Sequence, residues 1–299
     1  MKIVCIGEVM TELSLSNDAS SARLGVAGDT FNTAVYLKRS GKDIHDIAYL
    51  TALGTDRFSD QIVQRINDEQ LNSDHIIRSK ERVAGLYAIT TDDMGERSFT
   101  YWRENSAARL LFGNHTGPDF DTLAQFDVLY YSAISLAILA EDAKDLFLQH
   151  VEAFRALPGK QVAFDSNYRP RLWSDVDQAR RYTEQAWRLC DIALPSVDDE
   201  MTLFEDIDEQ AVLKRLRSFG VVRGALKRGA AGPIDLENPS ASPSLKPVAK
   251  VVDSTAAGDS FNGAYLACLL NGGTPVKALQ AGHDCASHVV QHAGAIVEQ

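Results

Sequence analysis

Cysteine is scarce in this 299-residue chain, and its four copies lie far apart at Cys5, Cys190, Cys268 and Cys285. Since none of them forms a C-x-x-C pair, the sequence lacks the usual zinc-ligand spacing and a disulfide framework. Long apolar runs are also missing. No segment approaches the roughly 20 apolar residues of a membrane-spanning helix, and the apolar run at 3–6 is too short for a signal peptide. We therefore expect a cytoplasmic protein with no membrane partner.

Positive charge is in short supply: 30 Lys and Arg residues face 41 Asp and Glu residues, which gives a net charge of -11. Without a basic stripe, such a chain is unsuited to the phosphate backbone of a nucleic acid. Two glycine signatures of nucleotide binding, G-x-x-x-x-G-K-[ST] and G-x-G-x-x-G, do not occur either. A bound nucleotide would have to be held in another way.

Short apolar runs that alternate with helical periodicity are the main pattern that is present. Alternation of this kind predicts an α/β fold with a mostly parallel central sheet covered by helices on both faces. The length suits a single domain over residues 1–299. The predicted strands are 2–7, 47–53, 127–132, 162–164, 192–194 and 222–226, and the predicted helices are 33–39, 58–66, 135–156, 175–190, 198–219 and 274–292.

The alternation is interrupted between residues 86 and 102. Residues 86–91 and 98–102 read as strands around a turn at 92–96 that contains a glycine, which is typical of a hairpin. Residues 11–16 alternate apolar and polar side chains, as in a sheet with one wet face. We expect these strands to form a small, discontinuous β-sheet lid from about 11–27 and 82–105.

Residues 251–270 read as a strand end, a small-residue loop and a helix, whose apolar positions recur at 261, 264, 265, 268 and 269. The side chains of Ala256, Ala257 and Gly258 are small enough for an anion to approach the main-chain amides at the helix N-terminus. Asp259 stands beside them, where a phosphate and a base would meet. The alternative is that Asp259 only caps the helix.

Polar residues follow each of the later predicted strands. Ligands of open parallel sheets bind beyond the carboxyl ends of the strands, so these residues should share one crevice. The turn at 227–232 is basic and suits phosphate oxygens, although a solvated loop is an equal alternative. For Arg169, the alternative to a role in ligand binding is an ion pair at the protein surface. The residues are Asp165, Asn167, Arg169, Pro195, Ser196, Lys227, Arg228, Gly229 and the stretch 256–259.

These motifs carry a family likeness. The pairing of A-G-D at 27–29 with V-D-S-T-A-A-G-D-S-F at 252–261 resembles the ribokinase-like (PfkB-type) carbohydrate kinases, and the likeness covers nearly the whole chain. Within that family, the sequence is similar to kinases of 2-keto-3-deoxygluconate. The strings that carry this second likeness are A-G-D-T-F-N at 27–32, G-L-Y at 85–87, G-E-R-S-F-T-Y-W-R at 95–103 and N-Y-R-P-R-L-W at 167–173.

The resemblance implies roles for individual residues. Asp259 would be the base that takes a proton from a sugar hydroxyl, beside an anion hole at Ala256, Ala257 and Gly258. Arg103 and Arg169 would suit the carboxylate of a keto acid. The implied sugar ligands are Gly28, Asp29, Asn32, Tyr87, Tyr101, Arg103, Arg169 and Asp259, and the implied ATP ligands are Asn167, Ser196, Lys227, Gly229, Gly232, Ala256 and Gly258.

Three positions depart from the family pattern. Ala256 replaces the first glycine of G-A-G-D, and Ala27 replaces the first glycine of G-G-D. Val197 stands where the family has the Asn of its N-x-x-E motif, if Glu200 is the matching acid. ATP and Mg²⁺ are implied as cofactors, but the residues that bind the metal stay unassigned.

We therefore expect ATP-dependent phosphorylation of a terminal hydroxyl of a sugar acid, with 2-keto-3-deoxygluconate going to its 6-phosphate. A fructokinase or another kinase of neutral sugars is the enzymatic alternative, and a non-catalytic sugar or nucleotide sensor on the same fold is an alternative of another class. The resemblance also leaves open a homodimer formed through the lid strands.

Overall fold

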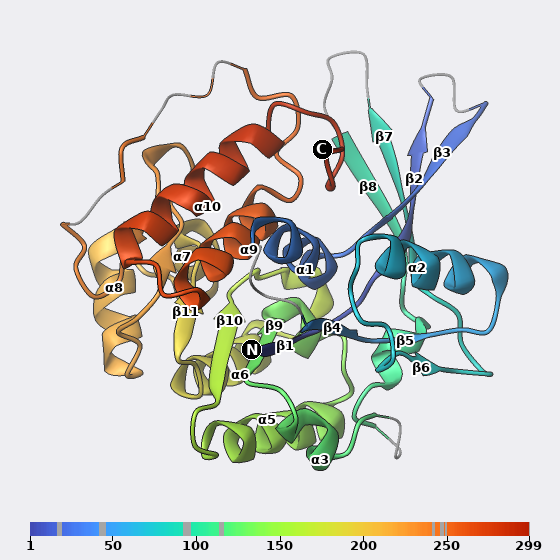
Figure 1. Ribbon diagram of the computed structural model, residues 1–299, viewed down its shortest axis with the longest axis horizontal. Coiled ribbons are helices and arrows are strands. Elements are labelled where there is room, and N and C mark those ends of the chain that lie inside the picture. Colours follow the sequence, from blue (N-terminus) through green and yellow to red (C-terminus); the bar gives the residue numbers. More distant parts are fainter. Residues whose placement is uncertain are drawn as a thin grey trace.

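The computed structural model describes residues 1–16, 20–41, 46–91, 97–113, 117–240, 243–245, 248 and 250–298. A parallel sheet of five strands, in the order β11-β10-β9-β1-β4, lies at its centre (Figure 1). The strands are β1 (Lys2–Ile6), β4 (Asp46–Leu50), β9 (Val128–Ser132), β10 (Gln161–Asp165) and β11 (Ile192–Leu194). The predicted α/β class and its parallel sheet are confirmed.

Helices cover both faces of this sheet, so its strands are apolar on both sides. In β1, Ile3 and Cys5 pack against one helical layer, and Val4 and Ile6 pack against the other. The first layer holds α1 (Asp29–Ser40), α2 (Arg57–Asp68), α9 (Ala257–Leu270) and α10 (Pro275–Val289). The second holds α3 (Phe120–Ala124), α4 (Ala133–Ala137), α5 (Glu141–Arg155), α6 (Val176–Arg188), α7 (Val197–Phe204) and α8 (Glu209–Ser218).

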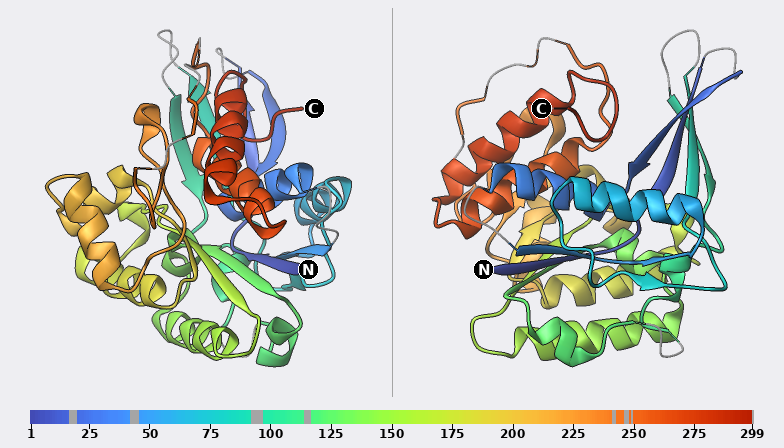
Figure 2. Two further views of the ribbon diagram at one scale, coloured as in Figure 1. Left: turned by 60° about the vertical axis from the view of Figure 1, so that its left-hand side comes forward. Right: turned by 45° about the vertical axis from the view of Figure 1, so that its right-hand side comes forward.

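A separate four-stranded sheet, in the order β3-β2-β7-β8, stands out from the α/β body (Figure 2). Its strands are β2 (Met10–Leu15), β3 (Ala22–Ala27), β7 (Leu86–Thr91) and β8 (Arg97–Trp102). We call it the small sheet. β2 pairs antiparallel with β3 and parallel with β7, and β7 pairs antiparallel with β8. The sequence predicted this second sheet, and the hairpin turn predicted at 92–96 lies outside the described residues.

Two predicted elements are divided in the structure. The strand predicted at 47–53 leaves the central sheet after Leu50, and Ala52–Leu53 (β5) pairs with Ile77–Arg78 (β6). The helix predicted at 135–156 is split into α4 and α5 because the chain is extended at Ala140. A capping box at Ser132 starts α4, and two acidic residues favour the N-terminus of α5.

Two predicted strands were wrong in part. Of residues 222–226 only Ala225–Leu226 (β12) is assigned as a strand, and it pairs antiparallel with β13 (Ile234–Asp235). Single parallel bridges from Gly224 to Ala193 and from Lys227 to Ser196 still place this stretch beside β11. Val251 and Val252 form no strand at all. The amide of Val252 donates to the carbonyl of Val290, so this stretch is held by the end of α10 instead.

The start of α1 also differs from its prediction. The helix was expected to begin at Thr33, but α1 already begins at Asp29 and its N-cap is Gly28. Asp29 is therefore free to point its carboxylate elsewhere. Three short 3-10 helices complete the described structure: Ala107–Leu110, Pro170–Leu172 and Gly229–Ala231. Within the described ranges, every helix is too short or too polar to span a bilayer.

Candidate active site

The N-terminus of α9 opens onto a cavity. Ala256 turns the chain into the helix with left-handed angles (φ 59°, ψ 16°), and no side chain caps the first turn. Left-handed backbone costs a non-glycine residue roughly 1–2 kcal/mol, so the turn is held by its surroundings. The free amides and the helix dipole together make a site for an anion. Asp259 lies in this same first turn and lines the cavity.

Close packing of α1 on α9 positions the Asp259 carboxylate. A side chain at Gly263 would lie 2.6 Å from the Leu37 amide nitrogen and 2.7 Å from the Thr33 carbonyl oxygen, so only glycine permits this approach. Asn32, on the facing side of α1, donates from Nδ2 to Asp259 Oδ2 over 2.8 Å. These contacts fix the Asp259 carboxylate at the N-terminus of α9.

The pKa of Asp259 is raised to about 8. Burial is the largest cause, and the neighbouring carboxylates of Asp29 and Asp165 add to it, whereas the hydrogen bond from Asn32 and the charge of Lys227 act in the opposite direction. A buried carboxyl group with a pKa near neutrality is suited to general-base catalysis.

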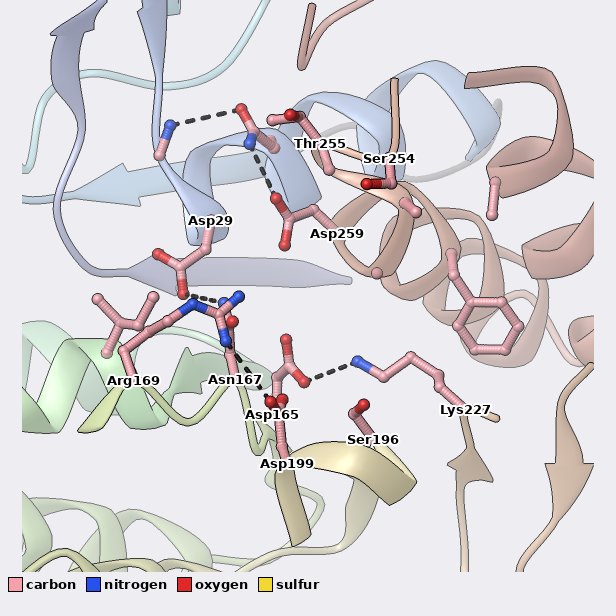
Figure 3. A pocket seen from close by; sticks show the side chains of 18 of the residues that line it. Asp29, Asp165, Asn167, Arg169, Ser196, Asp199, Lys227, Ser254, Thr255 and Asp259 are labelled. Carbon is pink, nitrogen blue, oxygen red and sulfur yellow. Dashed lines mark hydrogen bonds and ion pairs between the residues drawn. The ribbon is translucent and has the colours of Figure 1, made fainter. Parts of the chain in front are cut away.

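Two more carboxylates lie at the carboxyl ends of the central strands (Figure 3). Asp165, at the end of β10, accepts from Lys227 Nζ over 2.7 Å and from Asn262 Nδ2 over 2.9 Å. Asp29 accepts from Ser132 Oγ over 2.5 Å and from Asn167 Nδ2 over 3.0 Å. Burial raises the pKa of Asp29. Three acids thus share one cavity with a single lysine among their hydrogen-bond partners.

The cavity has a volume of about 630 Å³ and lies between the strand ends, α9 and the small sheet. Its size suits a small-molecule ligand. All but one of the residues to which the family resemblance assigned a role line it. These are Gly28, Asp29, Asn32, Tyr87, Tyr101, Arg103, Asn167, Arg169, Ser196, Lys227, Gly229, Ala256, Ala257, Gly258 and Asp259.

Gly232 is the one residue with such a role that does not line the cavity, and Pro195, expected in the same crevice, does not line it either. Gly232 ends the short helix Gly229–Ala231 with a φ of +78°, and its carbonyl accepts from Arg228 Nε. Its prediction as an ATP ligand is therefore not supported by its position. Arg228 also pairs with Glu209, so this part of the basic turn is engaged with protein groups.

The small sheet supplies one wall of the cavity. Tyr87 donates its hydroxyl to Glu12, and its ring lies 5.6 Å from that of Tyr101. Arg103, which follows β8, forms a buried ion pair with Glu8 and lies 5.8 Å from the Tyr101 ring centre. The arginine expected to meet a substrate carboxylate thus already has one carboxylate partner.

The opposite wall is formed by the residues after β10 and β11. Arg169 is half exposed and its Nη1 lies 3.5 Å from Asp199 Oδ1, so a surface pair of the kind considered as its alternative is present. Lys227 was expected on the ATP side, and its ammonium donates hydrogen bonds to Asp165 Oδ1 and Asn262 Oδ1. Ser196 remains at the cavity surface.

The acids after β11 divide into two groups. Glu200 is fully buried, accepts from Trp187 Nε1 and pairs with Arg215 over 2.8 Å; its pKa is raised to about 7 because of burial. Asp198 and Asp199 line the cavity instead. Glu200 therefore points away from the site, and matching it to the family's metal-linked acid is not supported.

Sequence reasoning missed several residues of the site. Asp165 was recognised only as a polar residue after a strand. Asn262 could have been found, because it follows Asp259 by three positions and so shares its helix face. Glu8 carried no signal, since its partner Arg103 is 95 positions away.

Sequence comparison places this geometry in a family. Residues 1–299 match the pfkB family of carbohydrate kinases. The chain belongs to that family. It is also 44% identical, over 99% of its length and 96% of the relative's, to a protein of Dickeya dadantii named 2-dehydro-3-deoxygluconokinase.

Solved structures share the fold of this pfkB-family chain. A 2-dehydro-3-deoxygluconokinase from Thermotoga maritima superposes with a TM-score of 0.84 at 19% identity, covering 99% of this chain and 96% of that one. A fructokinase from Xylella fastidiosa with bound ATP gives a TM-score of 0.81 at 21% identity, with coverages of 98% and 93%. The ribokinase-like fold expected from the sequence is confirmed.

Proposed function

We propose that this carbohydrate kinase transfers a phosphoryl group from ATP to a terminal hydroxyl of a sugar acid, with 2-keto-3-deoxygluconate going to its 6-phosphate. The observation that carries the proposal is the placement of Asp259 in the cavity beside the uncapped N-terminus of α9. The names of the full-length relatives supply the substrate class.

Asp259 would accept the proton of the attacking hydroxyl. Because Asn32 fixes its Oδ2, the other oxygen is the one available to the substrate. The amides of the first turn of α9 would stabilise negative charge on the transferring group. Phosphoryl transfer depends mainly on positioning and charge stabilisation, so a well-placed carboxylate and a set of fixed amides are sufficient.

ATP would supply the phosphoryl group, and its phosphates fit the uncapped N-terminus of α9. No cluster of three or more His, Cys, Asp or Glu side chains among the described residues is arranged as a metal cage. Mg²⁺ commonly keeps several waters and takes only one or two carboxylates besides phosphate oxygens. Asp198 and Asp199 line the cavity, and we assign to them the binding of the hydrated Mg²⁺.

Recognition of the sugar acid would fall to Arg103, Tyr87 and Tyr101 on the small sheet, with Arg169 from the opposite wall. Gly28, Asp29 and Asn32 would meet the hydroxyls. The small sheet would act as a lid that keeps water from the reacting groups. With its β3 and β8 edges unpaired among the described strands, it would also form the interface of a homodimer.

A coupled ADP-release assay with 2-keto-3-deoxygluconate tests this proposal. The wild type should turn over, and Asp259→Asn should reduce kcat by about a thousandfold while circular dichroism stays unchanged. Asp177→Asn, at an exposed position on α6, serves as the matched control. Activity retained in Asp259→Asn would refute the role, and binding without any turnover would favour a sensor.

A kinase of neutral sugars is the second candidate, and the Glu8–Arg103 pair favours it. Since that arginine is already neutralised, a substrate without a carboxylate would leave no charge unpaired. The same assay with fructose decides between them. A higher kcat/KM for fructose than for the keto acid would replace the first proposal by the second.

We also expect the protein to act in the cytoplasm. All four cysteines are free thiols, two of them buried, which is usual in a reducing compartment.

A further inference from the structure

Arg97 joins the small sheet to the loop before α9. It is the first residue of β8, the edge strand of that sheet, and its guanidinium forms an ion pair with Asp253. Its Nη1 also lies 3.5 Å from Thr255 Oγ1. Asp253 and Thr255 belong to the V-D-S-T-A-A-G-D stretch. None of the roles proposed above for the base and the anion hole involves Arg97.

Asp253 is built into the surrounding structure. Its Oδ2 accepts from the Gly294 amide over 2.7 Å, its Oδ1 accepts from the Thr255 amide over 3.0 Å, and its side chain is only 2% exposed. Burial opposes its ionisation, but these hydrogen bonds and the charge of Arg97 together hold its pKa below the usual range. The carboxylate is therefore a charged, fixed partner for Arg97.

The turn that Asp253 holds sets the direction of the amides at α9. Thr255 is followed directly by Ala256 in its left-handed conformation, and the Ala257 amide closes the turn by donating to the Ser254 carbonyl. Since no side chain caps the helix, the geometry of this turn is what aims the amides at 258 and 259 into the cavity. A loosened Asp253 would misdirect them.

The other end of β8 is anchored in a different way. Arg103, one residue beyond the strand, pairs with the buried Glu8 after β1. β8 is thus tied to the body at both ends, at one end near the sugar-binding wall and at the other beside the anion hole. The position of the small sheet and the geometry of the anion hole are coupled through a single strand.

We infer that Arg97 is a positioning residue for phosphoryl transfer, which orients the 253–258 turn and its amides from the small sheet. The inference rests on the proposed kinase function. Displacing a reacting group by about 1 Å can cost a hundredfold in rate, so Arg97→Ala should lower kcat by about ten- to a hundredfold. The KM for the sugar should change less than about threefold, because Arg97 does not line the cavity.

The test compares Arg97→Ala with Arg97→Lys and with Arg155→Ala. Lysine keeps the charge and should restore much of the rate, and Arg155 pairs with Asp191 at the opposite end of the central strands and serves as control. Amide hydrogen exchange in a peptide covering 253–260 is the second readout. It should be faster in Arg97→Ala than in the wild type and the control.

The outcomes separate this inference from the proposed function. A wild type without turnover refutes the kinase proposal, and the exchange measurement then still tests the contact. With an active wild type, unchanged exchange in Arg97→Ala overturns the inference, and so does faster exchange with an unchanged kcat. A variant that fails to fold is replaced by Arg97→Lys, for which an intermediate kcat and exchange rate are expected.

Discussion

The two walls of the cavity are built on different principles. On the body side, Asp165 and Asp259 are buried and Asp29 is half-buried. All three hold defined hydrogen bonds, with partners Ser132, Asn167, Asn262, Lys227 and Asn32. On the small-sheet side, Tyr87 and Arg103 are also buried and paired with Glu12 and Glu8. Tyr101 differs from them: it is 44% exposed and meets its neighbours through ring contacts and one cation–π contact.

This difference indicates a division of work. Buried, hydrogen-bonded carboxylates keep a fixed geometry at the reacting atoms. They also lower the stability of the folded protein, because burial disfavours the charged form. Aromatic side chains at a half-exposed edge adapt to a ligand at little cost. Substitutions in the body wall should therefore affect stability and kcat, and those of half-exposed aromatic side chains that line the cavity from the small sheet should affect KM.

Lys227→Met should have the largest effect on stability. It leaves the Asp165 carboxylate, 3% exposed, without its cation, and removing one partner of a buried pair costs about 3–5 kcal/mol. Urea denaturation measures the loss. Lys160→Met is the matched control, because its partner Asp127 lies 3.6 Å away and is half exposed; a change below about 1 kcal/mol is expected there. Equal losses in the two variants would remove the distinction between buried wall and surface.

Gly263→Ala should have the second-largest effect on stability. A methyl group at this position meets the backbone of α1 at 2.6 Å, and overpacking of this kind costs about 1–3 kcal/mol. Because α1 carries Asn32 and α9 carries Asp259, forcing the helices apart should also lower kcat. Thermal unfolding and steady-state kinetics on the same preparation check both effects. Lower stability with an unchanged kcat would show that the Asn32–Asp259 contact is dispensable.

The pH dependence should report Asp259. With a pKa of about 8 in the free protein, the ionised fraction rises about tenfold between pH 7 and pH 9, and kcat/KM should rise with it. A kcat/KM profile that is already flat above pH 6 would mean that the Asp259 carboxylate is ionised at neutral pH and that burial does not raise its pKa.

The same group gives a stability test whose sign is fixed. The folded protein keeps a proton on Asp259 up to about pH 8, whereas the unfolded chain loses it near pH 4. Between these values the unfolded state binds fewer protons, so stability should fall as the pH rises. Asp259→Asn should lack this part of the decline, which denaturation at pH 5, 7 and 9 would measure.

Tyr101→Ala should have the smallest effect. Loss of the contact that its ring would make with the sugar is worth about 0.7 kcal/mol, which corresponds to a KM for the sugar about threefold higher, with kcat nearly unchanged. Trp102→Ala is the matched control, because this neighbour is 56% exposed and does not line the cavity. A drop in kcat for Tyr101→Ala would place the small sheet among the rigid parts of the site.

Much of this site could be predicted because its signals are local. The small residues at 256–258 and the helical spacing from Phe261 place Asp259 at a helix start without any knowledge of the fold. The split of residues 135–156 and the loss of the strand at Val251 could not be predicted in this way. At Val251 the cause is a distant contact, since the carbonyl of Val290 binds the Val252 amide. In 135–156 the helix is broken by extended backbone at Ala140, a position that the apolar pattern does not mark.

The sequence by itself determined the alternation of strands and helices, the second sheet and the set of polar residues at the strand ends, because periodicity and small residues act over a few positions. Only the tertiary structure decided which charges meet. Lys227 pairs with Asp165, Arg103 pairs with Glu8 and Arg97 pairs with Asp253, and the partners lie 62 to 156 residues apart in the sequence. Such pairs depend on how whole elements pack, and no local pattern in the chain specifies them.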